Sequence, residues 1–361
     1  MSRPAVATID LEAIKQNYLL AKRLSNNARA VAIIKANAYG HGAVVVAHKL
    51  EESVDAFGVA CIEEAVELRN AGITKPILLL EGFFTPDELP YIAKNNIWCA
   101  IHNGQQIDQI ATMNLSDEIT FWLKMDSGMH RLGIAPEDYS ELYRKLNALP
   151  CCAEIVCMSH FSSSDEIDNP KTNTQMATFD ASTHEIKAQH SIANSAAILA
   201  HANARRDWQR PGIMLYGASP FDHEQENANA LQTVMRLTSK IIAIHDLNKG
   251  DPVGYGETWV CDKPTRVGTV AMGYADGYPR HAKNGTPVMI DGVKSRLIGR
   301  VSMDMITVDL SDVPDAHIGS DVEFWGENIS INEIARCADT IPYTLYTGIT
   351  SRVHKHYINE K

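Results

Sequence analysis

The sequence has little of what marks membrane-spanning, secreted or nucleic-acid-binding proteins. None of its apolar stretches approaches the roughly 18 residues that a membrane-spanning helix needs. The first ten residues contain no apolar run of the signal-peptide kind. Lys and Arg number 33 against 44 Asp and Glu, and the net charge of −11 disfavours a broad phosphate-binding surface. We therefore expect a cytoplasmic protein that binds neither membranes nor nucleic acids.

Several familiar catalytic signatures are also missing. The chain contains no GxGxxG, GxxxxGK[ST], GxSxG or HExxH pattern, so its chemistry must come from another arrangement. The seven cysteines are an odd number and form no Cys-x-x-Cys pair, and most lie in apolar runs. We expect reduced, buried thiols rather than disulfides or metal ligands, and we predict no metal site.

The first two thirds of the chain alternate short apolar runs with helical patterns, from about residue 29 to residue 217. Before them, Asp10 precedes apolar residues at helical spacing, which predicts a capped helix. Eight strands alternating with helices are typical of a (β/α)8 TIM-like barrel, although an open doubly wound sheet gives a similar string. The predicted strands are Ala30–Ile34, Ala56–Ala60, Ile77–Leu80, Ile97–Ile101, Ile119–Lys124, Glu154–His160, Ser191–Ala193 and Gly212–Tyr216.

After about residue 233 apolar runs are separated by Gly, Pro and Asp turns at short intervals, which indicates an all-β domain. We expect a barrel domain over 1–232, a linker within Glu224–Leu231 and a β-strand domain over 233–361 with one helix near Ile331–Ala338. The predicted strands of this domain are Val234–Ile244, Thr265–Gly273, Pro287–Ile290, Arg296–Ile298, Met305–Leu310 and Asp321–Phe324.

A lysine closes the first predicted barrel strand. Lys35 is followed by small residues, a tyrosine and two glycines up to Gly42. An amine at the mouth of an apolar pocket forms Schiff bases readily, because desolvation lowers its pKa; the ordinary alternative is a surface lysine at a strand end. The segment resembles the cofactor-lysine motif of alanine racemases, K-A-[ND]-A-Y-G-H-G. The resemblance implies that Lys35 binds pyridoxal 5′-phosphate (PLP) covalently and that Tyr39 helps to hold the phosphate.

The segment 123–133 resembles the fifth-strand segment of the same family. The resemblance implies that Arg131 contacts the phenolic oxygen of the cofactor and the substrate carboxylate, and that Lys124 can be carbamylated to orient Arg131. A guanidinium suits a carboxylate because its fork donates two parallel hydrogen bonds. His130 departs from the family pattern, where glycine is frequent, so the local backbone can differ.

The ends of the last three barrel strands continue the resemblance. The segment 158–161 is similar to a T-H-F segment, which implies that His160 bonds the catalytic tyrosine and the arginine below the cofactor ring. The segment 209–217 matches R-P-G-I-x-L-Y-G and places Arg210 at the pyridine nitrogen. A permanently cationic group there leaves that nitrogen unprotonated and disfavours transamination. The resemblance assigns the phosphate to the loops after strands seven and eight, where barrels commonly bind it, through Asn194, Ser195, Gly212 and Ile213.

Four segments of the predicted β domain extend the series. The segment 253–259 resembles the family segment whose tyrosine is the second catalytic base, here Tyr255. The segment 299–305 matches G-R-V-[SC]-M-D and implies that Met303 and Asp304 border the substrate. By the same resemblance, Tyr274 lines the entrance and Tyr343 binds phosphate.

The resemblance thus implies a PLP-dependent racemase of alanine that uses two bases, Lys35 for D-alanine and Tyr255 for L-alanine. It implies a head-to-tail homodimer, and a role in supplying D-alanine for peptidoglycan or in alanine catabolism. The alternatives are a racemase of broader specificity, for example for serine, and an amino-acid decarboxylase. The decarboxylases tend to carry an acidic residue in place of Arg210. A non-catalytic PLP carrier lacks the β domain, and a metal-dependent barrel hydrolase needs a ligand cluster that the strand ends do not supply.

Overall fold

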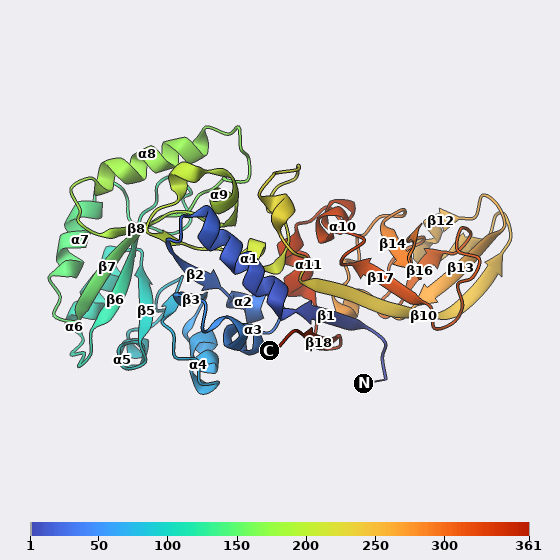
Figure 1. Cartoon of the computed structure of the whole chain (residues 1–361), viewed down its shortest axis with the longest axis horizontal. Helices are drawn as coiled ribbons and strands as arrows, with labels where there is room; N and C mark the ends of the chain where they lie inside the picture. The colour runs from blue at the N-terminus through green and yellow to red at the C-terminus, as the bar shows by residue number, and fades with distance from the viewer. Residues whose placement is uncertain (1, 361) are drawn as a thin grey trace.

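The computed structural model describes residues 2–360, and its N-terminal part is a barrel of parallel strands surrounded by helices (Figure 1). The strands follow the order β8-β7-β6-β5-β4-β3-β2-β9, and every pairing among them is parallel. The predicted (β/α)8 TIM-like barrel is therefore confirmed, and the open sheet is not adopted. Its strands are β2 (Arg29–Ile33), β3 (Ala56–Val59), β4 (Ile77–Leu79), β5 (Ile97–Ile101), β6 (Ile119–Lys124), β7 (Cys152–Met158), β8 (Gln189–Ser191) and β9 (Trp208–Gln209).

The barrel closes between β8 and β9 through single contacts instead of a regular ladder. Ser191 Oγ donates to the carbonyl of Trp208 at 3.0 Å, and the Arg210 N–H donates to the carbonyl of Ala193 at 3.1 Å. Both strands are short, and Pro211, which has no N–H to donate, follows β9 after one residue. The last strand therefore ends early, and the chain turns across the mouth of the barrel.

The predicted eighth strand, Gly212–Tyr216, is wrong. The strand ends at Gln209, and Ile213–Tyr216 forms a 3-10 helix that is fully buried at the top of the barrel. A run of four apolar residues is compatible with both a buried strand and a buried turn, so the sequence pattern could not distinguish these two structures.

Helices cover the outside of the barrel. The Asp10 side chain accepts the N–H groups of Glu12 and Ala13, as the predicted cap requires. None of the helices among residues 2–360 has the length and apolar character needed to cross a membrane. The helices of this part are α1 (Leu11–Leu24), α2 (Lys35–Tyr39), α3 (Ala43–Leu50), α4 (Ile62–Asn70), α5 (Leu89–Lys94), α6 (Gly104–Thr112), α7 (Tyr139–Asn147), α8 (Lys171–Thr183) and α9 (Ser195–Ala200).

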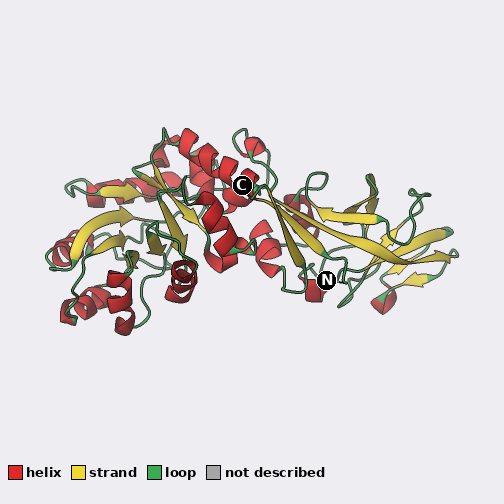
Figure 2. Cartoon of the chain, turned by 60° about the horizontal axis from the view of Figure 1, so that its bottom comes forward, coloured by secondary structure: helices red, strands yellow, loops and turns green. Residues whose placement is uncertain are grey.

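The C-terminal part is mainly β, as predicted, and Figure 2 shows strands filling it while helices gather around the barrel. Its sheet includes both ends of the chain, because β1 pairs with β10 and with β18. The domain boundary at residue 232 stays a prediction. The N-terminal strand β1, which the prediction assigned to the barrel domain, pairs with strands of the C-terminal sheet. The elements are β1 (Val6–Asp10), β10 (Met235–Leu247), β11 (Pro252–Val253), β12 (Trp259–Val260), β13 (Thr265–Val270), β14 (Pro287–Ile290), β15 (Val293–Arg296), β16 (Ile306–Asp309), β17 (Asp321–Trp325), β18 (His354–Ile358), α10 (Ile331–Cys337) and α11 (Pro342–Gly348).

Two details of the C-terminal part differ from the sequence prediction. The strand expected at Arg296–Ile298 lies earlier, over β15, and Leu297 makes only an isolated bridge to Val308. The strands β1 and β18 were not predicted, because neither has a continuous apolar run: side chains alternate between buried and half-buried in β1 and between exposed and half-buried in β18. All seven cysteines are free thiols; four are buried, as expected, whereas Cys61, Cys152 and Cys337 are only partly buried.

Candidate functional site

A cavity of about 590 Å³ opens at the carboxyl ends of the barrel strands, within the usual size of small-molecule sites. It brings together side chains from the ends of six different strands and two, Tyr343 and Thr347, that come from α11 in the C-terminal part. The predicted site residues that line it are Lys35, Tyr39, Lys124, Arg131, His160, Asn194, Ser195, Arg210, Gly212, Ile213 and Tyr343.

The turn that carries Lys35 and Tyr39 has an unusual backbone. The four residues from Ala36 to Tyr39 have φ values of 51°, 54°, 53° and 50°, which is one turn of left-handed helix. Left-handed geometry costs about 1–2 kcal/mol for each residue with a Cβ, so surrounding contacts must hold it in place. The turn redirects the chain as soon as β2 ends, and both Lys35 and Tyr39 then face the cavity.

The carboxylate of Glu64 and the buried ring of His41 stabilise this turn. One Glu64 oxygen accepts the N–H of Ala36 at 2.6 Å, and the other accepts the N–H of Ala60 at 2.8 Å. The Nδ1 of His41 lies 3.0 Å from the carbonyls of both Ala38 and Tyr39, so this nitrogen carries the proton. Burial lowers the pKa of His41 to about 3 and keeps the ring neutral. The lysine turn is therefore rigid before any ligand binds.

Arg210 lies at the floor of the cavity and is 4% exposed. Its guanidinium donates to the carbonyl of Ser191 at 2.8 Å, to the Ser191 hydroxyl and to the carbonyl of Ser159. Burial lowers the pKa of Arg210 to about 10, which leaves it cationic near neutrality. The structure thus has a fixed cation, and no carboxylate partner, at the position predicted to face the pyridine nitrogen.

The cations of the cavity act on one another. Burial, followed by the charges of Arg210 and Arg131, lowers the pKa of Lys124 to about 8. Burial and the same arginines, with Lys124 and Lys35, hold the pKa of His160 well below its usual range, so its imidazole is neutral. A cavity with this excess of positive charge suits an anionic ligand.

The opposite wall of the cavity presents hydroxyl and backbone groups. Ser195 Oγ accepts the N–H of Gly212 at 2.8 Å, and Asn194 caps α9 by accepting the N–H of Ala197 at 3.0 Å. A Cβ at position 212 would lie only 2.9 Å from the Tyr39 hydroxyl, so a larger residue than Gly212 would displace this hydroxyl. The ring of Tyr343 lies 5.8 Å from that of Tyr39.

The polar ends of six cavity residues have no hydrogen-bond or ion-pair partner among residues 2–360. Four of the lining side chains are cationic, and a single carboxylate, that of Glu81, opposes them. A phosphate, a phenolate oxygen and a substrate carboxylate are the anionic groups of PLP bound to an amino acid, and these donors match them in charge and kind. The residues therefore fit the cofactor. The six are Lys35, Tyr39, Lys124, Arg131, His160 and Tyr343.

Apart from Tyr343, the predicted site residues of the C-terminal part, Tyr255, Tyr274, Met303 and Asp304, do not line this cavity. Tyr255 is 69% exposed, Met303 is 52% exposed and Tyr274 is 37% exposed, so all three side chains have surface that their own chain does not cover. Tyr255 begins a 3-10 turn at the tip of the β11–β12 hairpin, between Gly254 and Gly256, which both have positive φ. Tyr255 and the cavity of Lys35 are therefore separate features of this chain.

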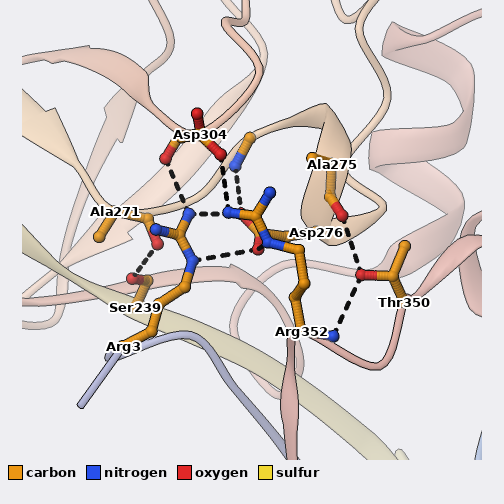
Figure 3. A network of polar contacts seen from close by, with 9 residues as sticks. Arg3, Ser239, Ala271, Ala275, Asp276, Asp304, Thr350 and Arg352 are labelled. Carbon is orange, nitrogen blue, oxygen red and sulfur yellow. Dashed lines mark hydrogen bonds and ion pairs between the residues drawn. The ribbon is translucent and has the colours of Figure 1, made fainter.

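A charged cluster fixes the segments that carry Tyr274, Met303 and Asp304 (Figure 3). Asp276, fully buried, receives two hydrogen bonds from Arg3, at 3.1 and 2.6 Å, and lies 3.3 Å from Arg352. Arg352 also bonds the carboxylate of Asp304 at 2.7 Å. We call Arg3, Asp276, Asp304 and Arg352 the Asp276 cluster.

Sequence reasoning missed several groups that shape the site. Glu81 follows β4 after one residue and lines the cavity, and the rule that barrel chemistry sits at the carboxyl ends of strands could have indicated it. Glu64 acts from α4 at long range, and no local pattern marks it. Among residues 2–360, no three His, Cys, Asp or Glu side chains are grouped as a metal site would require.

Comparison with known proteins covers nearly the whole chain. Residues 9–220 match the family model described as alanine racemase, N-terminal domain, and residues 234–357 match that of the C-terminal domain. The alanine racemase of Pseudomonas taetrolens is 52% identical over 358 residues, which span 99% of this chain and 100% of the relative. A catabolic alanine racemase of Pseudomonas putida is 51% identical with the same coverage.

Solved structures agree with these matches. The biosynthetic alanine racemase of Pseudomonas aeruginosa has a TM-score of 0.96 at 43% identity, covering 99% of this chain and 100% of that one. An alanine racemase of Bartonella henselae, described with covalently bound pyridoxal phosphate, has a TM-score of 0.90 at 28% identity, covering 98% and 99%. That of Bacillus anthracis, with bound L-Ala-P, has a TM-score of 0.86 at 30% identity, covering 100% and 97%. The chain belongs to the alanine racemase family, whose members use PLP to interconvert L- and D-alanine.

Proposed function

We propose that racemisation takes place in a site built from two chains, with Lys35 on one face of the substrate and Tyr255 of the partner subunit on the other. The observation that carries this proposal is the separation of the two groups: Lys35 lines the cavity, and Tyr255 projects from a hairpin tip away from it. Each chain would give its barrel to one site and its hairpin to the other, which requires a head-to-tail homodimer.

The cofactor supplies an aldehyde that binds the substrate amine and a conjugated ring that weakens the Cα–H bond. Lys35 would bind that aldehyde and move the α-proton of D-alanine at its Nζ. The Tyr255 hydroxyl of the partner subunit would move the proton of L-alanine from the opposite side. The tyrosines already in the cavity are poor bases, since burial raises the pKa of Tyr39 to about 12 and raises that of Tyr343 further above its usual range.

The surroundings of the cavity favour an ionised phenol at this position. The neutral His160 ring can accept a hydrogen bond from a phenol that enters beside it. The cationic side chains of Arg131 and Arg210 would lower the pKa of such a phenol. We therefore assign to His160 the orientation of the tyrosine, and to Arg131 the binding of the substrate carboxylate and the phenolic oxygen of the cofactor.

The remaining residues would hold the cofactor and bound the substrate. Arg210 would face the pyridine nitrogen and keep it unprotonated. Lys124, whose pKa of about 8 leaves part of it as free amine near neutrality, would take up CO2 as a carbamate and orient Arg131. The phosphate would be bound by Tyr39, Asn194, Ser195, Gly212, Ile213 and Tyr343, while Tyr274, Met303 and Asp304 of the partner subunit would enclose a small substrate such as alanine.

The free state of all seven cysteines supports a reducing compartment, and we propose the cytoplasm. The matches include both a biosynthetic and a catabolic racemase, so both the supply of D-alanine and its breakdown fit the reaction.

Proton exchange in heavy water tests the assignment of the two bases. Tyr255→Phe should lower the exchange of the α-proton of L-alanine by roughly 10²- to 10⁴-fold, the usual contribution of a positioned acid–base group, and that of D-alanine far less. Tyr143→Phe, which removes a hydroxyl from the outer helix α7, is the control and should exchange both enantiomers normally. Equal losses for the two enantiomers in Tyr255→Phe would contradict the assignment.

A further inference from the structure

A buried glutamine on the outer helix α8 contacts the segments that carry two of the proposed site residues, Arg131 and His160. Gln175 is 0% exposed and does not line the cavity. Its inward neighbours on α8 include Met176 and Phe179, so an apolar residue would be the ordinary choice at this position. A polar side chain persists there at a cost unless every one of its hydrogen bonds is made.

All four hydrogen-bonding positions of the Gln175 amide are in use. Nε2 donates to the carbonyl of His160 at 3.1 Å and to Ser127 Oγ at 3.4 Å. Oε1 accepts the backbone N–H of Ser162 at 3.0 Å and its hydroxyl at 3.1 Å. A carbonyl can only accept and a backbone N–H can only donate, so these two groups fix the orientation of the amide.

From Gln175 the hydrogen bonds continue in one direction toward the barrel. Ser127 Oγ lies 2.7 Å from Ser159 Oγ, which donates to the carbonyl of Met125 at 2.9 Å. Since the last group is an acceptor, Ser159 gives its proton to it, Ser127 gives its proton to Ser159, and Ser127 must itself accept from Gln175. A carboxylate at position 175 could not begin this series, because it has no proton to donate.

This series of hydrogen bonds joins two segments whose relative positions matter for the proposed mechanism. Ser127 lies in the loop that carries Arg131, and its turn is fixed by Asp126, which accepts the N–H groups of residues 128–130 at 3.0 Å. Ser159 precedes His160 at the end of β7, and its carbonyl accepts from Arg210. The contacts of Gln175 therefore link the loop of Arg131 to the end of β7 that carries His160, and Ser159 links that end to Arg210.

We propose that Gln175 is a positioning residue. Through its hydrogen bonds to Ser127, His160 and Ser162, it holds Arg131 and His160 in the relative positions that catalysis requires. This inference rests on the proposed roles of Arg131 and His160. It adds that the outer layer of the barrel sets their relative positions, although it never touches substrate or cofactor.

Gln106 provides a matched control on another barrel helix. It is 5% exposed on α6, its Nε2 donates to the carbonyl of Phe83 at 3.5 Å and its Oε1 accepts the N–H of His102 at 2.9 Å. It thus resembles Gln175 in burial and in bonding to barrel loops, but its loops carry neither Arg131 nor His160. Comparing the same substitution at the two positions therefore distinguishes displacement of Arg131 and His160 from a general loss of stability.

The experiment compares Gln175→Glu with Gln106→Glu in the PLP-loaded full-length enzyme. Gln175→Glu should lower kcat by roughly 10- to 100-fold, as misplacement of catalytic groups by about 1 Å does, and raise KM for alanine because Arg131 shifts. Hydrogen exchange should accelerate at the Ser162 N–H and over 126–134. Gln106→Glu should keep kcat within about twofold of wild type and leave exchange in these segments unchanged. Unchanged kcat in Gln175→Glu, or equal losses in both variants, would overturn the inference.

Two further variants keep the test decisive. If Gln175→Glu does not fold, Ser127→Ala removes one oxygen from the same series and should lower kcat by about three- to tenfold, and a normal kcat there would also overturn the inference. Arg131→Lys and His160→Asn report on the proposed function itself. Full activity in both would reject those roles, whereas activity lost in both but retained in Gln175→Glu would reject the role of Gln175 alone.

Discussion

The two halves of the proposed site are built in different ways. In the barrel half, buried hydrogen bonds hold Arg210, and the buried His41 holds the turn after Lys35. The rings of Tyr39 and Tyr216 stack at 4.8 Å within the main core. In the C-terminal half, the hairpin of Tyr255 rests on a small separate apolar cluster. That cluster contains Val253, Cys261, Val267 and Ile298, with Leu247 and Trp259 packed against it.

The difference shows where each half obtains its precision. The barrel places Arg210 before any ligand arrives, because moving it would leave the buried carbonyls of Ser191 and Ser159 without their donor. The hairpin packs against a small apolar cluster of its own chain. The exposed side chain of Tyr255 would be enclosed only when a partner subunit packs against it. We therefore expect changes in the barrel to act within one chain, and changes in the hairpin to act on the other chain of a dimer.

The largest expected effect comes from separating the two halves between chains. Lys35→Ala and Tyr255→Phe should each reduce racemisation by more than about 100-fold, because each removes one proton-transfer group from every site. When the two variants are unfolded, mixed and refolded together, half of the dimers are mixed and one of their two sites is complete. The mixture should recover about a quarter of the wild-type activity.

The control for this mixture is the double variant, Lys35→Ala with Tyr255→Phe on one chain, mixed with wild type. Each mixed dimer then has two incomplete hybrid sites, one without Lys35 and one without Tyr255, so only the wild-type dimers stay active. No recovery in the first mixture would show that both groups serve the same chain, and the contrast between the halves would fail.

The second prediction, with an effect of intermediate size, concerns the lowered pKa of Lys124 in the barrel half and its effect on stability. Its pKa is lowered from 10.5 to about 8, so between these values the unfolded chain holds a proton that the folded chain has released. The free energy of unfolding should therefore rise with pH in this window, by up to about 3 kcal/mol. Lys124→Met should lose this rise in CO2-free buffer, as measured by urea unfolding from pH 7.5 to 10.5.

Bicarbonate sharpens the Lys124 experiment. A carbamate replaces a cation by an anion among Arg131 and Arg210, so added bicarbonate should stabilise the wild-type protein near pH 8 but not Lys124→Met. The exposed Lys187, outside the cavity, gives the control Lys187→Met, which should behave as wild type in both measurements. A wild-type slope in Lys124→Met would mean that the lysine is not desolvated in solution.

The fold was predictable wherever the local pattern and the tertiary setting agree. The strands β5 and β6 begin and end where their apolar runs do, and Asp10 caps α1 as its side chain allows. The run Ile213–Tyr216 failed because burial on all sides removes the periodicity that separates a strand from a turn. The N-terminal strand β1 failed because its partners, β10 and β18, lie more than 200 residues away.

The candidate site was predictable to the extent that its residues follow strands in short motifs. Lys35, Arg131, His160 and Arg210 stand at strand ends, and the cavity brings them together. The groups that hold them, such as Glu64 and Gln175, act from helices through distant backbone atoms, and no spacing in the sequence reports such a contact. The assignments of individual roles remain predictions for the experiments above.

The smallest expected effect concerns the Asp276 cluster of the C-terminal half. Asp276→Asn leaves Arg3 and Arg352 without a buried counter-charge and should lower the free energy of unfolding by about 1–3 kcal/mol. Arg3→Met removes a partner whose head group is partly exposed and should cost less than about 1 kcal/mol. Both variants loosen the turns of Tyr274 and Met303, so kcat/KM should fall in the same order. The affinity for PLP should stay unchanged in both, because no residue of the cluster lines the cavity of its own chain. A loss of PLP affinity that matches the loss of kcat/KM would show that the two halves are mechanically coupled within one chain, which the contrast between them denies.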